Sequence, residues 1–460
     1  MFGNFSDTIT RKQSGVCTMH WYQMKLLGRA QTHSSDSQVC RPDTVADVSK
    51  YMEQVGKSGI IARGSGSAYA DQALNSGGAV MMSDRLDRIR SFDEKTGELV
   101  CEPGLTLETI THLFAPRGFM FPIATGSGRR TLGGAIASNL FGMNCRKKAA
   151  LSQAIKWMDI VLADGSTVRA DKQNNADLFS AVIGGQGLIG FISLISITLL
   201  KRPDRNVHVV RRRYPNLDAL LDALRDARKN ADFCVAWVDT SARGNAVGRS
   251  VLKTASFTAD PVSGSLVSMP KIKRGLPRFM LNLAAMPLIK DIRYRLSSGN
   301  SDRIIPYEDF IYPSDHFGVV SPKNVYQLRF SFSEAEGPQA IRQILTELSE
   351  MRIHACRAVV QPTADETVAD LAFPMRGYCL SLDFIRRKGL EEFLRHLMMI
   401  ACEHKGRVAL CNDALMEMRF LFRMYKGLEA FTAARKKYDP QEKFDSDFAR
   451  RVLKEDDNDE

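Results

Sequence analysis

The chain has 460 residues, 44% hydrophobic and 25% charged, which is long enough for two or more hydrophobic cores. Its net charge of +11 suits nucleic acid, an anionic membrane surface or a phosphorylated substrate. No recognition-helix, zinc-finger or RNA-binding signature accompanies this charge, so nucleic acid is not expected as a partner. The start lacks a signal-peptide pattern, and no apolar run approaches the roughly 18 residues of a membrane span, which predicts a cytoplasmic protein.

Nine cysteines are scattered along the chain without a CxxC pair, so a disulfide framework is not expected and a reducing compartment fits best. The eight histidines are dispersed as well, and Cys402-Glu-His404 lacks a second cluster at ligand spacing, so no metal site is predicted. Nucleophilic catalysis has no GxSxG elbow to support it, and Cys145 beside Arg146 is only a candidate reactive thiol.

From Cys40 to Leu200, short apolar runs alternate with helical stretches and glycine turns, which is typical of an α/β or α+β domain. Asp43 or Thr44 can cap a first helix, and the strand after it runs into a glycine-rich turn. The predicted helices are 45–55, 106–117 and 175–182, and the predicted strands are 59–62, 78–82, 98–101, 158–162 and 190–200.

After Arg202 the pattern changes to a repeated order of strand, helix and strand. The predicted strands are 207–213, 233–238, 328–332, 355–360, 380–384 and 407–411, and the helices are 217–228, 338–351 and 389–404. This order predicts a second domain built on a large, mostly antiparallel sheet with helices on one face, so the fold class is α+β.

Residues 261–302 interleave basic and apolar side chains. Such a segment is either a flap that contacts anionic lipid or a lipid-phosphate substrate, or a helical hairpin with one solvated face, and the sequence leaves both open. The acidic tail 454–460 is expected to be solvated.

Three segments are rich in Gly, Ser and Thr: 62–71, 125–139 and 184–190. Because glycine lacks a Cβ, its backbone N–H groups can approach a pyrophosphate or a flat ring, and we predict that the first two segments bind a ligand. The third contains GxGxxG, but a helical pattern precedes it and a strand follows, the reverse of the dinucleotide-binding order. We interpret this third segment as a tight helix-to-strand turn.

Several of these motifs, in this order and spacing, are shared with a known family. They are Arg63 to Tyr69, Glu102-Pro-Gly104, Thr131-Leu-Gly-Gly-Ala135, the strand and turn 158–165, and 184–190. With them the chain resembles flavoproteins of the vanillyl-alcohol oxidase type, which carry an FAD-binding domain of the PCMH type. A closer resemblance, to the family of decaprenylphosphoryl-β-D-ribose 2'-oxidases, rests on Leu27-Gly28, 236–239, 313–318 and 437–451, so it spans nearly the whole chain.

That resemblance implies an FAD-binding domain over 1–201, a substrate domain over 202–425, and a C-terminal segment, 426–460, that returns to the FAD domain. The FAD-binding residues it implies are Ala62, Arg63, Gly64, Ser65, Gly66, Ser67, Ala68, Tyr69, Ala70, Asp71, Gly126, Thr131, Leu132, Gly133, Gly134, Ser138, Asn139, Leu140, Phe141 and Ile192. Many relatives bind flavin covalently through a histidine that Ser67 replaces here, and Arg129 stands near the position of a second linking cysteine. We therefore predict non-covalent FAD.

Oxidising a carbinol requires an acceptor, which flavin N5 can be, and a group that takes or shares the hydroxyl proton. Side chains that could face the flavin from strands of the second domain are Trp237, Gln327, Arg329, Ser381 and Asn412. Each also has a purely structural interpretation, because Trp237 suits a core and Gln327 or Ser381 can satisfy backbone groups.

The chain departs from its closer relatives at the expected catalytic positions. Asn412 replaces a lysine, Ser381 a cysteine, and Phe141 and Met143 a histidine and a lysine that flank the flavin. Asparagine can hydrogen-bond a hydroxyl but cannot act as a base. We take Asn412 and Arg329 as candidate catalytic residues, with Arg329 restoring a charge.

Tyr69 and Tyr312 are the candidate proton partners, whereas Trp237, Gln327, Ser381 and Phe141 are expected to contact substrate. The leading hypothesis is an FAD-dependent enzyme that oxidises a secondary hydroxyl of a sugar or polyprenyl-phosphate sugar, as in cell wall polysaccharide biosynthesis. A short-chain reductase would then be its partner. The alternatives are an alditol or aldonolactone oxidase of the same fold, and a flavin-binding protein with altered catalysis. The electron acceptor and the oligomeric state stay open.

Overall fold

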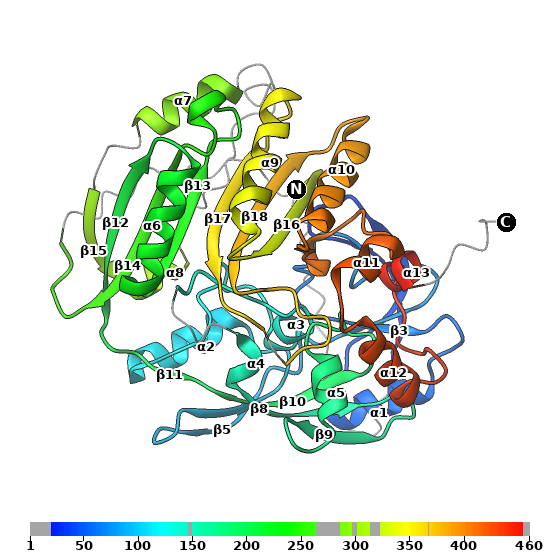
Figure 1. Cartoon of the computed structure of the whole chain (residues 1–460). Helices are drawn as coiled ribbons and strands as arrows, with labels where there is room; N and C mark the ends of the chain where they lie inside the picture. Colours follow the sequence, from blue (N-terminus) through cyan, green and yellow to red (C-terminus); the bar gives the residue numbers. More distant parts are fainter. Residues whose placement is uncertain are drawn as a thin grey trace, which may run out of the picture.

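A computed structural model describes residues 20–145, 150–263, 286–296, 301–312, 323–366 and 368–453. Two halves pack together, one with several small sheets and one with a single large sheet (Figure 1). The predicted α+β fold class is confirmed. The motif at 313–318, the tail 454–460 and most of the basic segment 261–302 lie outside the described residues.

The first half begins with a four-stranded sheet in the order β1-β2-β4-β3. Its strands are β1 (Tyr22–Leu27), β2 (Ser34–Cys40), β3 (Ile60–Arg63) and β4 (Ala79–Met82). Helix α1 (Val45–Glu53) crosses over from β2 to β3, and Thr44 caps it by accepting a hydrogen bond from the backbone of Asp47. The crossover lets β3 run parallel to β4, so β3 ends where the first glycine-rich segment begins.

A five-stranded antiparallel sheet follows, in the order β5-β6-β10-β8-β9. Its strands are β5 (Ile89–Asp93), β6 (Glu98–Cys101), β8 (Ile155–Val161), β9 (Thr167–Asp171) and β10 (Phe191–Thr198). The central strand β10 is apolar along most of its length because neighbouring strands and helices cover both of its faces. The helices of this half are α2 (Leu107–Phe114), the 3-10 turn η1 (Ala115–Arg117), α3 (Leu132–Ala137), α4 (Leu151–Ala154) and α5 (Ala176–Val182), and a short ribbon pairs β7 (Phe119–Met120) with β11 (Leu200–Lys201).

The second half is one eight-stranded antiparallel sheet in the order β15-β12-β14-β13-β17-β18-β16-β19. Its strands are β12 (Asn206–Tyr214), β13 (Phe233–Val238), β14 (Ser250–Thr258), β15 (Ser301–Pro306), β16 (Val325–Ser333), β17 (Arg357–Thr363), β18 (Gly377–Ile385) and β19 (Arg407–Val408). Helices α6 (Leu217–Asn230), α9 (Gly337–Glu350) and α10 (Leu390–Glu403) cover one face (Figure 1). The shorter elements are η2 (Gly244–Ala246), α7 (Met286–Leu296) and α8 (Tyr307–Ile311).

The two faces of this sheet differ in chemistry. Along β16, Leu328, Phe330 and Phe332 belong to the hydrophobic core under the helices. Because side chains alternate along a strand, Gln327 and Arg329 project from the opposite face, toward the first half of the molecule. The face turned away from α6, α9 and α10 therefore carries Gln327 and Arg329, while α8 packs on its β12 end.

After the 3-10 turn η4 (Leu410–Asn412), the chain returns to the first half through α11 (Met418–Met424), α12 (Leu428–Tyr438) and α13 (Asp447–Leu453) (Figure 1). Helix α12 packs on α5, and Phe444 forms a bridge with Ile60 at the start of β3. Arg451 of α13 forms ion pairs with both Asp71 and Asp413. The last helix thus holds the first glycine segment and the turn that carries Asn412.

A disulfide joins Cys145 to Cys234, and Asn144 pairs with Phe233 beside it. The two cysteines are 89 residues apart in sequence, which is why spacing did not reveal the pair. The interpretation of Cys145 as a candidate reactive thiol is wrong, because its sulfur is bonded. The link ties the loop after Phe141 to β13, an interior strand of the large sheet.

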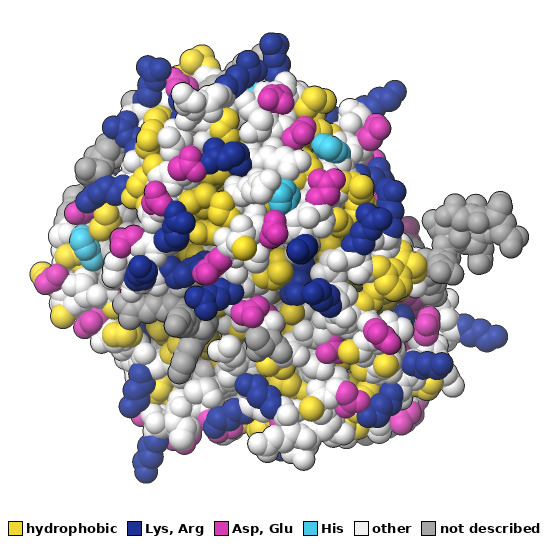
Figure 2. All heavy atoms as spheres, in the orientation of Figure 1, with side chains coloured by type: hydrophobic (Ala, Val, Ile, Leu, Met, Phe, Trp, Pro, Cys, Tyr) yellow, Lys and Arg dark blue, Asp and Glu magenta, His cyan; other side chains and the backbone are white. Residues whose placement is uncertain are grey.

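No helix in the described ranges has the length and apolar character to cross a bilayer. Figure 2 shows Lys and Arg side chains spread over the visible face, with acidic side chains between them. The positive net charge is thus distributed on this face rather than gathered into one patch.

Candidate active site

All three glycine segments line one pocket, whose space of about 530 Å³ includes open solvent at its mouth. Its lining residues are Ala62, Gly64, Ser83, Pro103, Gly133, Gly134, Ala137, Val182, Gly185, Gln186, Gly187, Leu188, Ile189, Gly190, Phe191 and Ile192. The segment 184–190 is a helix-to-strand turn as predicted, since α5 precedes it and β10 follows. Its contribution to the cavity wall was missed, although its glycine content was the signal.

Two close approaches show why the walls need glycine. A Cβ on Gly64 would lie 2.1 Å from the hydroxyl oxygen of Thr131, and one on Gly133 would lie 2.7 Å from Cβ of Pro103. Thr131 also caps α3 by accepting a hydrogen bond from the Gly134 amide. Bare backbone is therefore packed around the cavity, the surface that a diphosphate and a flat ring require.

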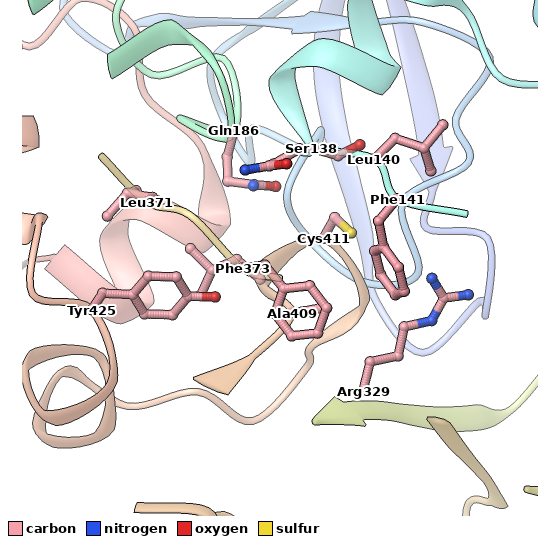
Figure 3. A pocket seen from close by; sticks show the side chains of 12 residues that line it. Ser138, Leu140, Phe141, Gln186, Arg329, Leu371, Phe373, Ala409, Cys411 and Tyr425 are labelled. Carbon is pink, nitrogen blue, oxygen red and sulfur yellow. The ribbon is translucent and has the colours of Figure 1, made fainter. Parts of the chain in front are cut away.

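A second pocket lies between the end of α3 and the polar face of the large sheet, and its space of about 310 Å³ also includes open solvent (Figure 3). Its lining residues are Ser138, Asn139, Leu140, Phe141, Gln186, Leu371, Phe373, Ala409, Leu410, Tyr425, Arg329 and Cys411. Arg329 rises from β16 toward Phe141, with its guanidinium carbon 5.6 Å from the ring centroid. This cavity combines flat aromatic walls with one positive charge.

Gln186 lines both cavities, so they adjoin and form one elongated site. A glycine-walled end and an aromatic end fit the two ends of FAD, which joins a diphosphate nucleotide to a flat isoalloxazine ring. Nine of the predicted FAD-binding residues line one cavity or the other: Ala62, Gly64, Gly133, Gly134, Ser138, Asn139, Leu140, Phe141 and Ile192. The side-chain amide nitrogen of Asn139 is buried and has no hydrogen-bond partner among the residues that the structure describes, as expected of a donor aimed at a ligand.

Other residues of the first segment have partners within the protein. Arg63 donates hydrogen bonds to the backbone oxygens of Ala73 and Leu27, and burial lowers its pKa. The carboxylate of Asp71 pairs with Arg451. Gly126 has a left-handed backbone with φ of 70° and lies outside the lining of the two cavities. These residues shape the loops rather than line the cavities.

A hydrogen-bonded network joins three of the predicted site residues. The Nδ2 of Asn412 donates to Oε1 of Gln327 over 2.6 Å, and Nε2 of Gln327 donates to the Tyr69 hydroxyl over 3.2 Å. The same Nε2 donates to Oδ1 of Asp383 over 2.6 Å. Arg357 lies 3.5 Å from the other carboxylate oxygen of Asp383. Four elements therefore meet at one polar site.

The register of the paired strands explains why Asp383 and Arg357 lie in this network. Neither residue was predicted from the sequence. Gln327 is directly opposite Asp383, and Asp383 is directly opposite Arg357. Directly paired residues of antiparallel strands project from the same face, so the three side chains form one row. Burial opposes the charge of Arg357, yet Asp383 and Tyr69 hold its pKa above the ordinary value.

A second row on the same face contains three more predicted residues. Trp237 is opposite Val359, Val359 is opposite Ser381, and Ser381 is opposite Arg329. The side chains of Trp237 and Ser381 are both buried. Ser381 contacts the thiol of Cys379 at 3.7 Å. The sheet thus places Arg329 next to Ser381 and leaves Trp237 three strands away.

Two predicted catalytic residues are placed differently from expectation. Tyr312 bonds to Thr111 and to the backbone oxygen of Leu107 in α2, and burial raises its pKa to about 12. It is therefore separate from the network around Gln327. Asn412, expected on a strand, ends a 3-10 turn because Asp413 binds the backbone amides of Leu415 and Met416 and turns the chain.

The family of FAD binding domains matches residues 37–171. The decaprenylphosphoryl-beta-D-ribose oxidase of Mycolicibacterium smegmatis is 25% identical over 444 residues, which cover 92% of this chain and 95% of that protein. An uncharacterized protein of the mprA 5' region of Streptomyces coelicolor is 27% identical over 76% of this chain and 100% of its own length. A probable mitochondrial D-2-hydroxyglutarate dehydrogenase of Oryza sativa subsp. indica is 30% identical over 36% of this chain and 32% of its own length.

The matched range contains the first two glycine segments, and the third completes the same cavity. FAD is therefore the cofactor of this chain. The chain is an FAD-dependent oxidoreductase that acts on CH–OH groups, and residues 37–171 match its FAD binding domain.

Proposed function

We propose that the protein oxidises a secondary hydroxyl of a sugar or of a lipid-linked sugar phosphate. The main support is the Tyr69, Gln327 and Asn412 network, a set of hydroxyl-binding groups beside the aromatic cavity. Similarity over 92% of the chain to a decaprenylphosphoryl-ribose oxidase supports the same substrate class. Bound FAD supplies the two-electron acceptor.

In this proposal the network positions the carbinol. Gln327 is fixed on both sides, because its Oε1 accepts from Asn412 and its Nε2 donates to Asp383. The Tyr69 hydroxyl oxygen accepts a hydrogen bond from the Gln327 side-chain amide. Because this amide is fixed, it holds the Tyr69 hydroxyl in one orientation. Asp383 and Arg357 act as positioning residues that hold Gln327.

Tyr69 is then the group that shares the carbinol proton. Its oxygen accepts one hydrogen bond from the Gln327 amide, and its second lone pair can accept a hydrogen bond from the carbinol hydroxyl. Asn412 contributes a hydrogen bond but no basic group. Tyr312 is an alternative only for a substrate that reaches α2, because its hydroxyl is bonded there.

Further parts of the proposal rest on likeness and on sequence pattern. We place the FAD-binding domain at 1–201 with 426–460, and the substrate domain at 202–425. We also propose that a reductase converts the keto product onward, that the segment 261–302 contacts a lipid or membrane surface, and that the protein acts in the cytoplasm. Of that segment, α7 exposes Leu288 and Ile292, as a lipid-facing helix would.

Anaerobic bleaching of the flavin tests the substrate class. The FAD-loaded protein is mixed with a pentose phosphate, a polyprenyl-phosphate pentose or a free alditol, and absorbance near the flavin maximum is followed. Bleaching by the sugar phosphates and not by the alditol supports the proposal, and a Tyr69→Phe variant should bleach at least about tenfold more slowly. Bleaching by the alditol alone would overturn it.

A further inference from the structure

Three arginines lie around the aromatic cavity and the Tyr69 network. The guanidinium of Arg29 lies 5.6 Å from the ring centroid of Tyr69, and that of Arg329 lies 5.6 Å from the ring centroid of Phe141. Arg130 lies near both: burial, with repulsion from Arg329 and Arg29, lowers its pKa to about 10. Three positive charges therefore share one small region.

These charges have no acidic partner among the described residues, unlike Arg357 and Arg451, which also face inward. Arg451 pairs with Asp71 and Asp413, and Arg357 pairs with Asp383. In contrast, the Nε of Arg329 is buried and makes no hydrogen bond within the described structure. Arg29, Arg130 and Arg329 are partly buried, and partly buried charges without an acidic partner are costly, so such a cluster indicates that a ligand supplies the negative charge.

The cofactor diphosphate does not fill this role in our assignment. The glycine-walled cavity that fits the diphosphate has its own lining, and Gln186 separates it from the Arg329 side. Asp383 is the nearest carboxylate of the network, and it is already bound to Gln327 and Arg357. The positive charge is thus left for the substrate.

The cluster also adjoins the groups that would hold the carbinol. Arg329 lies two residues after Gln327 on β16, and both project from the same face. On the other side, the Tyr69 amide donates to the backbone oxygen of Cys411, which lies in the wall of the Arg329 cavity. An anion held by the arginines would therefore be close to the hydroxyl that is oxidised.

We propose that Arg130 and Arg329, with Arg29 at the edge, form an oxyanion site that binds a carboxylate or phosphate group of the substrate next to the reacting carbinol. This inference rests on the proposed function, because it takes the Tyr69 network as the carbinol site. It adds that the substrate is an anionic hydroxy compound and not a neutral alditol or lactone. Guanidinium groups suit both anions, which they bind in a bidentate manner.

Anion binding to the FAD-loaded protein tests the proposal without turnover. Inorganic phosphate and, separately, acetate are titrated at constant ionic strength, with the visible flavin spectrum and heat of binding as readouts. We expect saturable binding of at least one anion and a shift of the flavin bands. Arg130→Gln and Arg329→Gln should each weaken that binding about tenfold or more, because each removes a charge-assisted contact.

Arg129→Gln is the matched control, because Arg129 is an exposed arginine of the same loop. It should bind both anions as the wild type does. Arg329→Lys keeps the positive charge but loses the planar guanidinium group that can donate two parallel hydrogen bonds. It should bind phosphate better than Arg329→Gln does. Retained FAD absorbance and an unchanged Tm in each variant separate a lost contact from a lost fold.

The two anions distinguish the source of the negative charge. Tighter binding of phosphate indicates a sugar phosphate, and tighter binding of acetate indicates a hydroxy acid. Absence of saturable binding in the wild type, equal binding by the arginine variants, or displacement of phosphate by added FAD would overturn the oxyanion site. If the anion binds but sugars never bleach the flavin, the proposed function fails while the oxyanion site stands.

Discussion

Asn412 and Gln327 are joined by a 2.6 Å hydrogen bond although 85 residues separate them in the sequence. Each is 2% exposed, so neither amide can exchange its partner for water. The bond connects the turn after β19 to the centre of β16 and fixes the amide that faces Tyr69.

Replacing Asn412 with leucine should lower the free energy of unfolding by about 1–3 kcal/mol, because Oε1 of Gln327 would stay buried without a donor. Urea unfolding monitored by tryptophan fluorescence measures this change. Gln361→Leu is the matched control: Gln361 is a buried amide of the same sheet that donates to the backbone oxygen of Gly142. Gln361→Leu should lower the free energy of unfolding by a similar amount but leave the rate of flavin bleaching unchanged. Asn412→Leu should lower both. Equal bleaching by the two variants would contradict the role of Asn412.

Gly64→Ala should abolish FAD binding. The new methyl group would lie 2.1 Å from the Thr131 hydroxyl, which must move and release the cap of α3. Loss of a helix cap alone lowers the free energy of unfolding by about 1 kcal/mol. The displaced Thr131 side chain also narrows the cavity. Flavin fluorescence quenching gives the affinity. Gly56→Ala should bind FAD normally, since nothing lies within 4 Å of its Cβ position.

Acid precipitation should leave the flavin in the supernatant. Ser67 bonds to the hydroxyl of Ser65 over 2.9 Å, and a serine hydroxyl at this position does not form the covalent flavin link that a histidine can form. The absorption spectra of pellet and supernatant decide the point. A yellow pellet after washing would show a covalent bond that this prediction excludes.

Arg451→Met should destabilise the protein more at pH 7 than at pH 4. Burial raises the pKa of Asp413 above 3.8, and the charge of Arg451 opposes that rise. Without the arginine, the pKa of Asp413 rises further in the folded state only. The folded variant then binds a proton more tightly than the unfolded chain, so its stability falls as pH rises above about 4.

At neutral pH the loss should be about 3–5 kcal/mol, since two buried carboxylates lose their partner. Chemical unfolding at several pH values measures it. The exposed pair of Arg419 with Glu417 provides the control, and Arg419→Gln should leave the unfolding midpoint unchanged at each pH. A pH-independent loss in Arg451→Met would contradict the role of Asp413.

Local patterns in the sequence predicted most elements of the fold. The β6 and β13 ranges, 98–101 and 233–238, match the structure, and Thr44 caps α1 as one of the two expected residues. Apolar periodicity and capping residues act within a few positions, so they can be read from one chain. Strand β1 (Tyr22–Leu27) was missed because most of its side chains are exposed and carry little pattern.

The site was predictable only in part, for a physical reason. Tyr69, Gln327 and Asn412 were expected near the flavin, but their mutual hydrogen bonds depend on how β16 and the turn after β19 meet. Asp383 was missed because its role follows from register with Gln327. Arg130 lies in a loop, where neither periodicity nor spacing tells which way a side chain points.

Arg451 forms ion pairs with Asp71 and Asp413, which flank the two halves of the site. It lies 380 residues after Asp71 in the sequence. During synthesis, the first glycine segment emerges long before α13 exists to hold it. The nascent chain can therefore display the glycine loops without a completed cofactor pocket. The cofactor pocket is therefore complete only after α13 has been synthesised, and folding of the N-terminal half alone does not complete it.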